Sequence, residues 1–198
     1  MSRWFTPESS VLVLIDHQIG TLQLVKNLPS DVALRNAIVL SKTAKTLGMP
    51  IVMTSSMEDQ LQGPIAPALR QVAPEAHAAR IKRAGIVNAW DDPNFEKAVR
   101  ATDRHQLVMA GVTTDVCLVF PAVGAVADGF TVQAVLDASG SPTEISEAAA
   151  ERRMERAGVV LTATNTIVAE LVRNWTRPGG GDLVQLMLAS APIMPPVT

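Results

Sequence analysis

Two apolar stretches decide the fold of this chain: VLVLI at residues 11–15, which leads directly into Asp16, and QLVMAG at residues 106–111, which leads toward Cys117. Each is a largely continuous apolar run of strand length, as expected for a strand covered on both faces in a parallel sheet. Each is followed by a residue whose side chain can take part in catalysis. Ligands of open parallel sheets bind outside the carboxyl ends of the strands, so we look for the functional groups there.

Strand-like and helix-like segments alternate outward from these two runs. Further strands are expected at 51–54, near 80–82, at 131–136 and at 159–162, with helices at 31–47, 93–102, 115–128, 141–157 and 164–174. The alternation predicts an α/β fold: a single three-layer, doubly wound domain around a mostly parallel six-stranded sheet in the order 3-2-1-4-5-6. This domain is expected to span residues 1–176. The segment 177–198 is expected to be an extension that packs on the body or on a neighbouring subunit.

Composition excludes several classes of protein. The chain has 198 residues, of which 47% are apolar and 18% charged, with a net charge of -2. A disordered chain would have lower hydrophobicity and higher net charge, and a nucleic-acid or polybasic membrane protein would have a basic excess. No apolar run is long enough for a membrane span or a secretory signal, so we expect a cytoplasmic protein. A single cysteine excludes an internal disulfide framework and a multi-cysteine metal site.

Three residues are candidates for catalysis. Cys117 lies in the first turn of a predicted helix, whose N-terminus favours a thiolate, although a lone cysteine is often a small buried hydrophobe. Asp16 ends a buried strand, where a charge needs a partner, and it could equally form a structural ion pair. Lys82 lies in RIKRAG at 80–85, a basic cluster that by itself suggests a solvated face. Together they supply a nucleophile, a base and a charge partner.

These residues resemble the Asp–Lys–Cys arrangement of the isochorismatase-like cysteine hydrolases. GVTTDVC at 111–117 is the most specific part of the resemblance, which covers roughly residues 9–176. Within that superfamily, the YcaC-like branch is the most similar, through the stretches VLVLIDHQIGTLQLV, GIVNAWDDPNF, VCLVFPAV and DASGSPTEIS. The resemblance implies an isochorismatase-like, Rossmann-type fold and a hydrolase that acts on a non-peptide C–N bond of a small amide-type substrate.

The resemblance also implies a mechanism. Asp16 would take the proton of Cys117 and later return it to the leaving amine, while the sulfur carries the acyl group as a thioester. Lys82 would balance the charges of Asp16 and Cys117. Both it and the helix end are expected to lower the pKa of the thiol, whereas Asp16 is expected to oppose this effect. A cis peptide bond is expected at Val112–Thr113, and the N–H groups of Thr113 and Cys117 would form the oxyanion hole.

Five residues are expected to bind the small-molecule substrate: Gln18, Asn88, Trp90, Val112 and Thr113. Gln18 could instead hold a neighbouring loop, and Trp90 could be an ordinary packed aromatic residue.

Neither a metal nor a cofactor is expected. The nicotinamidase branch of the superfamily has an Asp-x-His pattern after the second strand, where this chain reads TSSM at 54–57. The three histidines, His17, His77 and His105, lack ligand spacing, and no nucleotide-binding glycine motif follows a strand. Proteins of this kind are usually oligomers, so the resemblance implies a homo-oligomer.

Two other functions stay open. One is a thiol-based redox or ligand-binding protein on the same fold, whose resolving thiol would have to come from another molecule. The other is an isochorismatase-type vinyl-ether hydrolase, which would use Asp16 and Lys82 as acids without the sulfur. Replacing Cys117 by alanine separates this second alternative from an amidase.

Overall fold

Six strands form one parallel sheet in the computed structural model, which describes residues 4–190. The strands are β1 (Ser10–Ile15), β2 (Ile51–Ser56), β3 (Ile81–Arg83), β4 (Gln106–Gly111), β5 (Thr131–Val135) and β6 (Val160–Thr162). They lie in the order β3-β2-β1-β4-β5-β6, and every neighbouring pair is parallel. The predicted fold class and strand order are confirmed.

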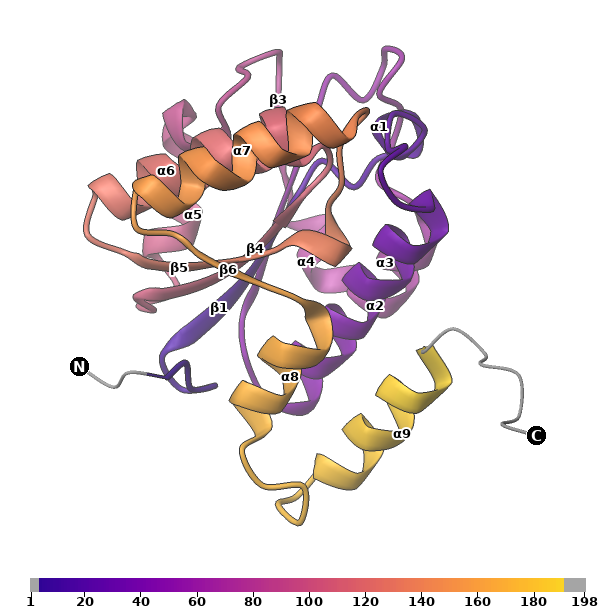
Figure 1. The fold of residues 1–198 in the computed structure, drawn as a ribbon, viewed down its shortest axis with the longest axis vertical. Helices are drawn as coiled ribbons and strands as arrows, with labels where there is room; N and C mark the ends of the chain where they lie inside the picture. Colours follow the sequence, from indigo (N-terminus) through magenta and orange to yellow (C-terminus); the bar gives the residue numbers. More distant parts are fainter. Residues whose placement is uncertain (1–3, 191–198) are drawn as a thin grey trace.

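Helices cover both faces of this sheet (Figure 1). The α-helices are α1 (Ile19–Leu22), α2 (Ser30–Thr46), α3 (Pro67–Val72), α4 (Pro74–Ala78), α5 (Pro93–Arg100), α6 (Val119–Ala127), α7 (Glu144–Arg156), α8 (Thr164–Val172) and α9 (Gly180–Ser190). Three short turns complete the set: η1 (Ala89–Asp91), η2 (Thr114–Leu118) and η3 (Leu136–Ala138). Between β2 and β3 lie the short helices α3 and α4, each with a proline in its first turn.

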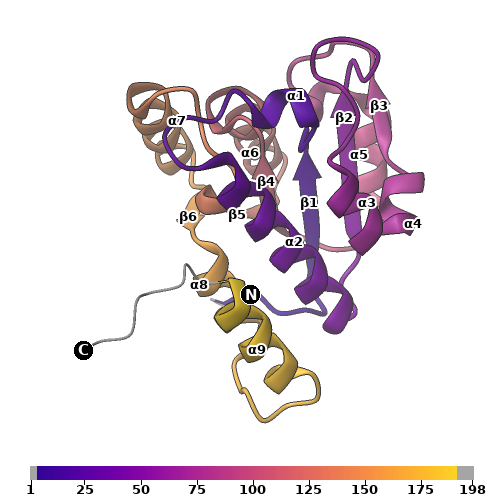
Figure 2. The same ribbon diagram turned by 90° about the vertical axis from the view of Figure 1, so that its right-hand side faces the viewer.

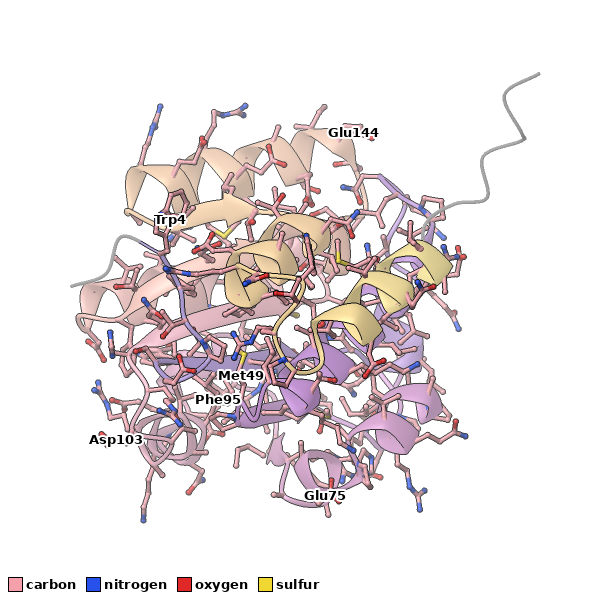
Figure 3. All side chains as sticks on the ribbon, turned by 90° about the horizontal axis from the view of Figure 1, so that it is seen from below. Trp4, Met49, Glu75, Phe95, Asp103 and Glu144 are labelled. Atoms are coloured by element: carbon pink, nitrogen blue, oxygen red, sulfur yellow. The ribbon has the colours of Figure 1, made fainter. Side chains whose placement is uncertain are left out.

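The burial of both faces of β1 explains why residues 11–15 of this strand are all apolar. Leu12 and Leu14 face a core shared with α2, α3 and α8, whereas Val13 and Ile15 face a second core shared with α5, α6 and α7. Because both faces are buried, no position in the strand can be polar without a partner. Figure 3 shows side chains between the sheet and both helix layers, with the labelled Glu75 and Glu144 on the outer helices α4 and α7.

The last helix, α9, packs on α2 and α8. Leu183 is fully buried in the core that these helices share, and Leu186 and Met187 pack against it. In Figures 1 and 2, α9 lies at the end of the molecule opposite α1. The division into a domain at 1–176 and an extension at 177–198 stays a prediction, and residues 191–198 lie outside the described part of the chain.

The carboxyl ends of β1, β2, β3 and β4 lie side by side. Ile15 is in register with Thr54 on one side and with Gly111 on the other, and Ser56 is in register with Arg83. Figure 2 shows this edge from the side, where β1 points toward α1. The residues that follow these four strands are therefore brought to one place by the sheet alone.

Candidate active site

Asp16 is the first residue after β1, and its backbone is turned sharply there. Its φ is 57°, a left-handed conformation that few non-glycine residues adopt, and its N–H donates to the Thr54 carbonyl at 3.0 Å. The hydroxyl of Thr21 donates to the Asp16 carbonyl. This turn redirects the chain at the sheet edge, and the Asp16 carboxylate is almost completely buried there.

A buried arginine, Arg83, is the ionic partner of Asp16. Its Nη2 donates to Asp16 Oδ2, and the two side chains are only 1% and 2% exposed. Its Nε donates to Thr54 Oγ1 at 3.1 Å, and its Nη1 donates to the carbonyls of Ile86 and Val87. A buried ion pair is stable only when the remaining donors are also satisfied, and this guanidinium meets that condition.

The structure corrects the placement expected for Lys82. Its side chain is 62% exposed, and its Nζ lies 3.3 Å from Glu58 Oε2 rather than beside Asp16. The reason is the alternation of side chains in β3, which sends adjacent residues to opposite sides of the strand. Arg83, one residue further on, therefore occupies the position predicted for Lys82.

Lys82 belongs to an ion cluster around Glu58, separate from the Asp16–Arg83 pair. Arg80 donates to both carboxylate oxygens of Glu58, at 2.6 and 2.9 Å, and Ser55 Oγ donates at 2.7 Å. The hydrogen bonds from Arg80 are the main reason why the pKa of Glu58 falls to about 2. The negative charge that Lys82 balances is therefore that of Glu58.

Cys117 lies on η2, the turn between β4 and α6. The predicted cis peptide bond between Val112 and Thr113 is confirmed. Gly111 allows the close approach that this turn requires, because a Cβ at that position would come within 3.2 Å of the Ile15 side chain and 3.3 Å of the Cys117 backbone. The nucleophile candidate is thus packed against the end of β1, where Asp16 begins.

The Cys117 thiol interacts directly with the Asp16 carboxylate. Burial, followed by the charge and hydrogen bond of Asp16, raises the pKa of the thiol far above its usual range. Arg83 and the N–H of Thr113 act in the opposite direction but are weaker. Burial and the opposing effect of Asp16 thus outweigh the lowering effects of the helix end and of a nearby cation, so the expectation of a thiol with a lowered pKa is wrong.

Asp16 is the nearest base for that proton. Burial raises the pKa of its carboxyl, and the charge and hydrogen bond of Arg83 oppose this effect. Its second oxygen, Oδ1, is buried and has no hydrogen-bond partner among the described nitrogen and oxygen atoms. A carboxylate held by Arg83 on one oxygen can therefore accept a proton on the other.

The two N–H groups expected to bind an oxyanion differ in their surroundings. A backbone hydrogen bond from Thr113 lowers the pKa of the Cys117 thiol, and Thr113 lines the cavity described below. The N–H of Cys117 donates to the Thr113 carbonyl at 2.7 Å, and this bond occupies it. The role of the two N–H groups as an oxyanion hole stays a prediction.

A cavity of about 270 Å³ opens over these groups. Its lining residues are Asp16, Thr21, Leu24, Ser56, Met57, Gln62, Arg83, Gly85, Val87, Val112, Thr113, Val116 and Cys117. Val112 and Thr113, both predicted to contact substrate, are among them. Gln18, Asn88 and Trp90 are not.

Gln18 holds two loops together instead of lining the cavity. Its Oε1 accepts the Ser56 N–H at 2.8 Å, and its Nε2 donates to the carbonyls of Ser56, at 2.8 Å, and Gly63. Both amide hydrogens are used in this way, and the side chain is fully buried. The alternative role foreseen for Gln18, holding the neighbouring loop, is the one that the structure gives it.

Asn88 and Trp90 have structural contacts as well. Asn88 Oδ1 accepts the Trp90 N–H at 3.1 Å, and its Nδ2 donates to Asp91 Oδ1 at 2.8 Å, so it caps η1. The Trp90 ring packs edge-on against Phe95 and Phe130, and its Nε1 donates to Asp128 Oδ2 at 3.0 Å. Trp90 is therefore the packed aromatic residue that the sequence left open as an alternative.

Among the lining residues that were not predicted from the sequence, Arg83 and Gln62 have the long polar side chains most relevant to the chemistry of the cavity. For Arg83 a signal existed, because Ile81 and Arg83 are two positions apart and so share a face of β3. For Gln62 there was none, since it lies in a loop. In residues 4–190, no three His, Cys, Asp or Glu side chains are grouped as metal ligands would be, and no helix described there is long and apolar enough to span a membrane.

Comparisons with known proteins identify relatives of this chain. Residues 10–166 match the isochorismatase domain family. The probable hydrolase YcaC of Escherichia coli is 40% identical over 166 residues, which cover 84% of this chain and 79% of that protein. Isochorismatase domain-containing protein 2A of Mus musculus is 26% identical over 187 residues, or 94% of this chain and 86% of that protein.

Two solved structures of YcaC proteins are also similar. YcaC from Pseudomonas aeruginosa with hexane-2,5-diol and covalent acrylamide superposes with a TM-score of 0.90 at 36% identity, covering 96% of this chain and 94% of that one. The Escherichia coli YcaC structure, described as an octameric hydrolase of unknown specificity, has a TM-score of 0.86 at 36% identity, covering 96% and 97%. The resemblance predicted from the sequence, including its YcaC-like branch, is confirmed.

Proposed function

The chain belongs to the isochorismatase family, and from that premise we propose that it is a cysteine hydrolase that cleaves the C–N bond of a small amide. The observation that carries the proposal is the contact of one partly buried thiol, Cys117, with the Asp16–Arg83 pair in the wall of a cavity. A thiol, a base and a group that fixes the base are the three parts that nucleophilic catalysis requires. The hydrolase class is supported by the relative described as a probable hydrolase.

In the first half of the reaction, Asp16 takes the thiol proton as the sulfur of Cys117 attacks the amide carbonyl carbon. The carbonyl oxygen becomes an oxyanion, which the N–H of Thr113 stabilises, and loss of one such donor typically costs about 3 kcal/mol. The C–N bond then breaks, and the proton passes from Asp16 to the leaving nitrogen. An amine or ammonia departs and the acyl group stays on the sulfur as a thioester.

In the second half, Asp16 takes a proton from water as the water oxygen attacks the thioester carbon. The C–S bond breaks, the sulfur regains a proton from Asp16, and the carboxylic acid leaves. One amide and one water give one acid and one amine. Arg83 keeps the charge of Asp16 stable in the buried site, the role that the sequence assigned to Lys82.

Two properties of relatives support further parts of the proposal. The Pseudomonas aeruginosa YcaC structure contains covalent acrylamide, an amide that reacts with nucleophiles such as thiolates. The Escherichia coli YcaC structure is described as octameric. We extend both to this chain, as a reactive cysteine and as a homo-oligomer whose mass in solution is a multiple of the 21.1 kDa subunit.

The test compares the wild type with Cys117→Ala, Cys117→Ser and Asp16→Asn on a panel of small amides, with released ammonia or amine as the readout. Cys117→Ala is expected to lose activity by a factor on the order of 10⁴ or more, and Asp16→Asn by about 10²–10⁴. Urea unfolding checks that each variant is folded. Full amide hydrolysis by Cys117→Ala would refute the proposal, because the acyl group could then not be carried on the sulfur.

A further inference from the structure

The charges inside the cavity restrict which substrates it accepts. Among the lining residues only Asp16 and Arg83 carry a charge. Arg83 has Asp16, Thr54 and two backbone carbonyls as acceptors and is 1% exposed, so it has little capacity left for a ligand. Within residues 4–190 the cavity thus offers no free cation to a substrate carboxylate, and Asp16 would repel one.

The walls of the cavity are apolar. Leu24, Met57, Val87, Val112 and Val116 supply apolar side chains to its lining. The volume of about 270 Å³ lies at the low end for ligand pockets. Such a site favours a short apolar group over a large or charged one.

One polar group of the cavity stands out. Gln62 lines it, and its Oε1 atom is buried without a hydrogen-bond partner in the described part of the chain. A buried acceptor that lacks a donor costs about 1–3 kcal/mol, so this oxygen favours a ligand that brings an N–H.

The loop that carries Gln62 is fixed in place. The Gly20 N–H donates to the Gln62 carbonyl at 2.9 Å. α1 approaches so closely that a Cβ on Gly20 would lie 1.9 Å from the Leu61 carbonyl oxygen. Because the backbone is held on both sides of the side chain, the acceptor is positioned before a ligand arrives.

We infer that this site selects an uncharged carboxamide with a short apolar acyl chain, and that Gln62 Oε1 accepts the substrate N–H while the Thr113 N–H faces the carbonyl oxygen. The inference rests on the proposed function, since it places the amide carbon at Cys117. It identifies Gln62 as a specificity-determining residue and excludes substrates that carry a carboxylate next to the scissile bond.

The test uses alkylation of Cys117, which needs no known substrate and is unambiguous because the chain has one cysteine. Three reagents of similar size are compared: iodoacetamide, which is neutral and has N–H groups, iodoacetonitrile, which is neutral and has none, and iodoacetate, which is an anion. Rates are measured by intact mass and divided by those of the same protein unfolded in guanidinium chloride. This ratio removes the intrinsic reactivity of each reagent.

The expected order of these normalised rates is iodoacetamide first and iodoacetate last, with at least about a tenfold difference between the two from repulsion by Asp16. Gln62→Leu should lower the preference for iodoacetamide over iodoacetonitrile by about two- to tenfold, the factor that one neutral hydrogen bond provides. Gln60→Leu makes the same chemical change two residues away, on an exposed side chain outside the cavity, and should leave the preference unchanged.

The other outcomes overturn the inference in distinguishable ways. If iodoacetate reacts as fast as iodoacetamide, or if Gln62→Leu behaves as Gln60→Leu does, the substrate class is wrong while Cys117 remains a nucleophile. If none of the three reagents alkylates the folded protein, the accessible thiol that the proposed function requires is absent, and both proposals fail together.

Discussion

Replacing Arg83 and Lys82 in turn by alanine distinguishes the two basic residues at the end of β3. Arg83→Ala removes the partner of a carboxylate that is 2% exposed, and breaking a buried ion pair in this way costs about 3–5 kcal/mol of unfolding free energy. Lys82→Ala removes an ammonium that is 62% exposed, from a carboxylate that keeps Arg80. An exposed pair of this kind is worth less than about 1 kcal/mol.

Urea unfolding followed by circular dichroism measures this difference. With a denaturant dependence of about 2 kcal/mol per molar urea, the midpoint should fall by about 2 M in Arg83→Ala and by less than about 0.5 M in Lys82→Ala. Should Arg83→Ala not fold, Arg83→Lys keeps the charge but loses the planar set of five donors, and we expect an intermediate loss.

A second readout separates the role of Arg83 in the site from its contribution to stability. Arg83 lowers the pKa of Asp16, so its loss raises that pKa further, and Asp16 becomes able to accept the thiol proton only at higher pH. The rising limb of the alkylation rate of Cys117 against pH should therefore move to higher pH in Arg83→Ala and stay in place in Lys82→Ala. Equal midpoints and equal pH profiles in the two alanine variants would refute the assignment of Arg83.

Two further predictions concern residues next to the site. His17 is fully buried and burial lowers its pKa from 6.5 to about 4, so the unfolded chain binds the extra proton first. The contribution of His17 to the free energy of unfolding is therefore fully present above about pH 6.5 and falls by on the order of 3 kcal/mol toward pH 4. Urea unfolding of the wild type should show this loss relative to His17→Gln. Trp90→Phe should cost about 1 kcal/mol through the lost hydrogen bond to Asp128 and leave the alkylation of Cys117 unchanged, with Trp175→Phe as the exposed control. Slower alkylation of Cys117 in Trp90→Phe would contradict this prediction and indicate that Trp90 lines the cavity.

The sequence predicted the sheet because the burial of a strand is visible in its own short pattern of apolar residues. A continuous apolar run such as that of β1 fits only a strand covered on both faces, and helix-like segments between such runs leave few topologies. The same local reading placed Asp16 and Cys117 at the ends of neighbouring strands, where the structure brings them into contact.

Lys82 and Arg83 show that the local pattern of residues does not predict which side chain of a short strand points into the site. β3 has three residues, and two adjacent basic side chains in it differ only in the face to which they point. A shift of one residue exchanges the faces, and no apolar periodicity of sufficient length fixes the register in so short a strand. Packing against Thr54 and Asp16 decides it, because only one of the two side chains reaches a buried acceptor.

Tertiary structure also decided the state of the thiol and the walls of the cavity. A helix end and a nearby cation are visible in the sequence and lower the pKa of a cysteine, but the burial that outweighs them at Cys117 depends on everything packed around it. Gln18 and Gln62 are alike in sequence, yet backbone groups use every polar atom of the first and leave an acceptor of the second unpaired. The sequence alone thus determined that Asp16 and Cys117 meet at the sheet edge, whereas the identity of their cationic partner, their protonation and their availability follow from contacts between segments far apart in sequence.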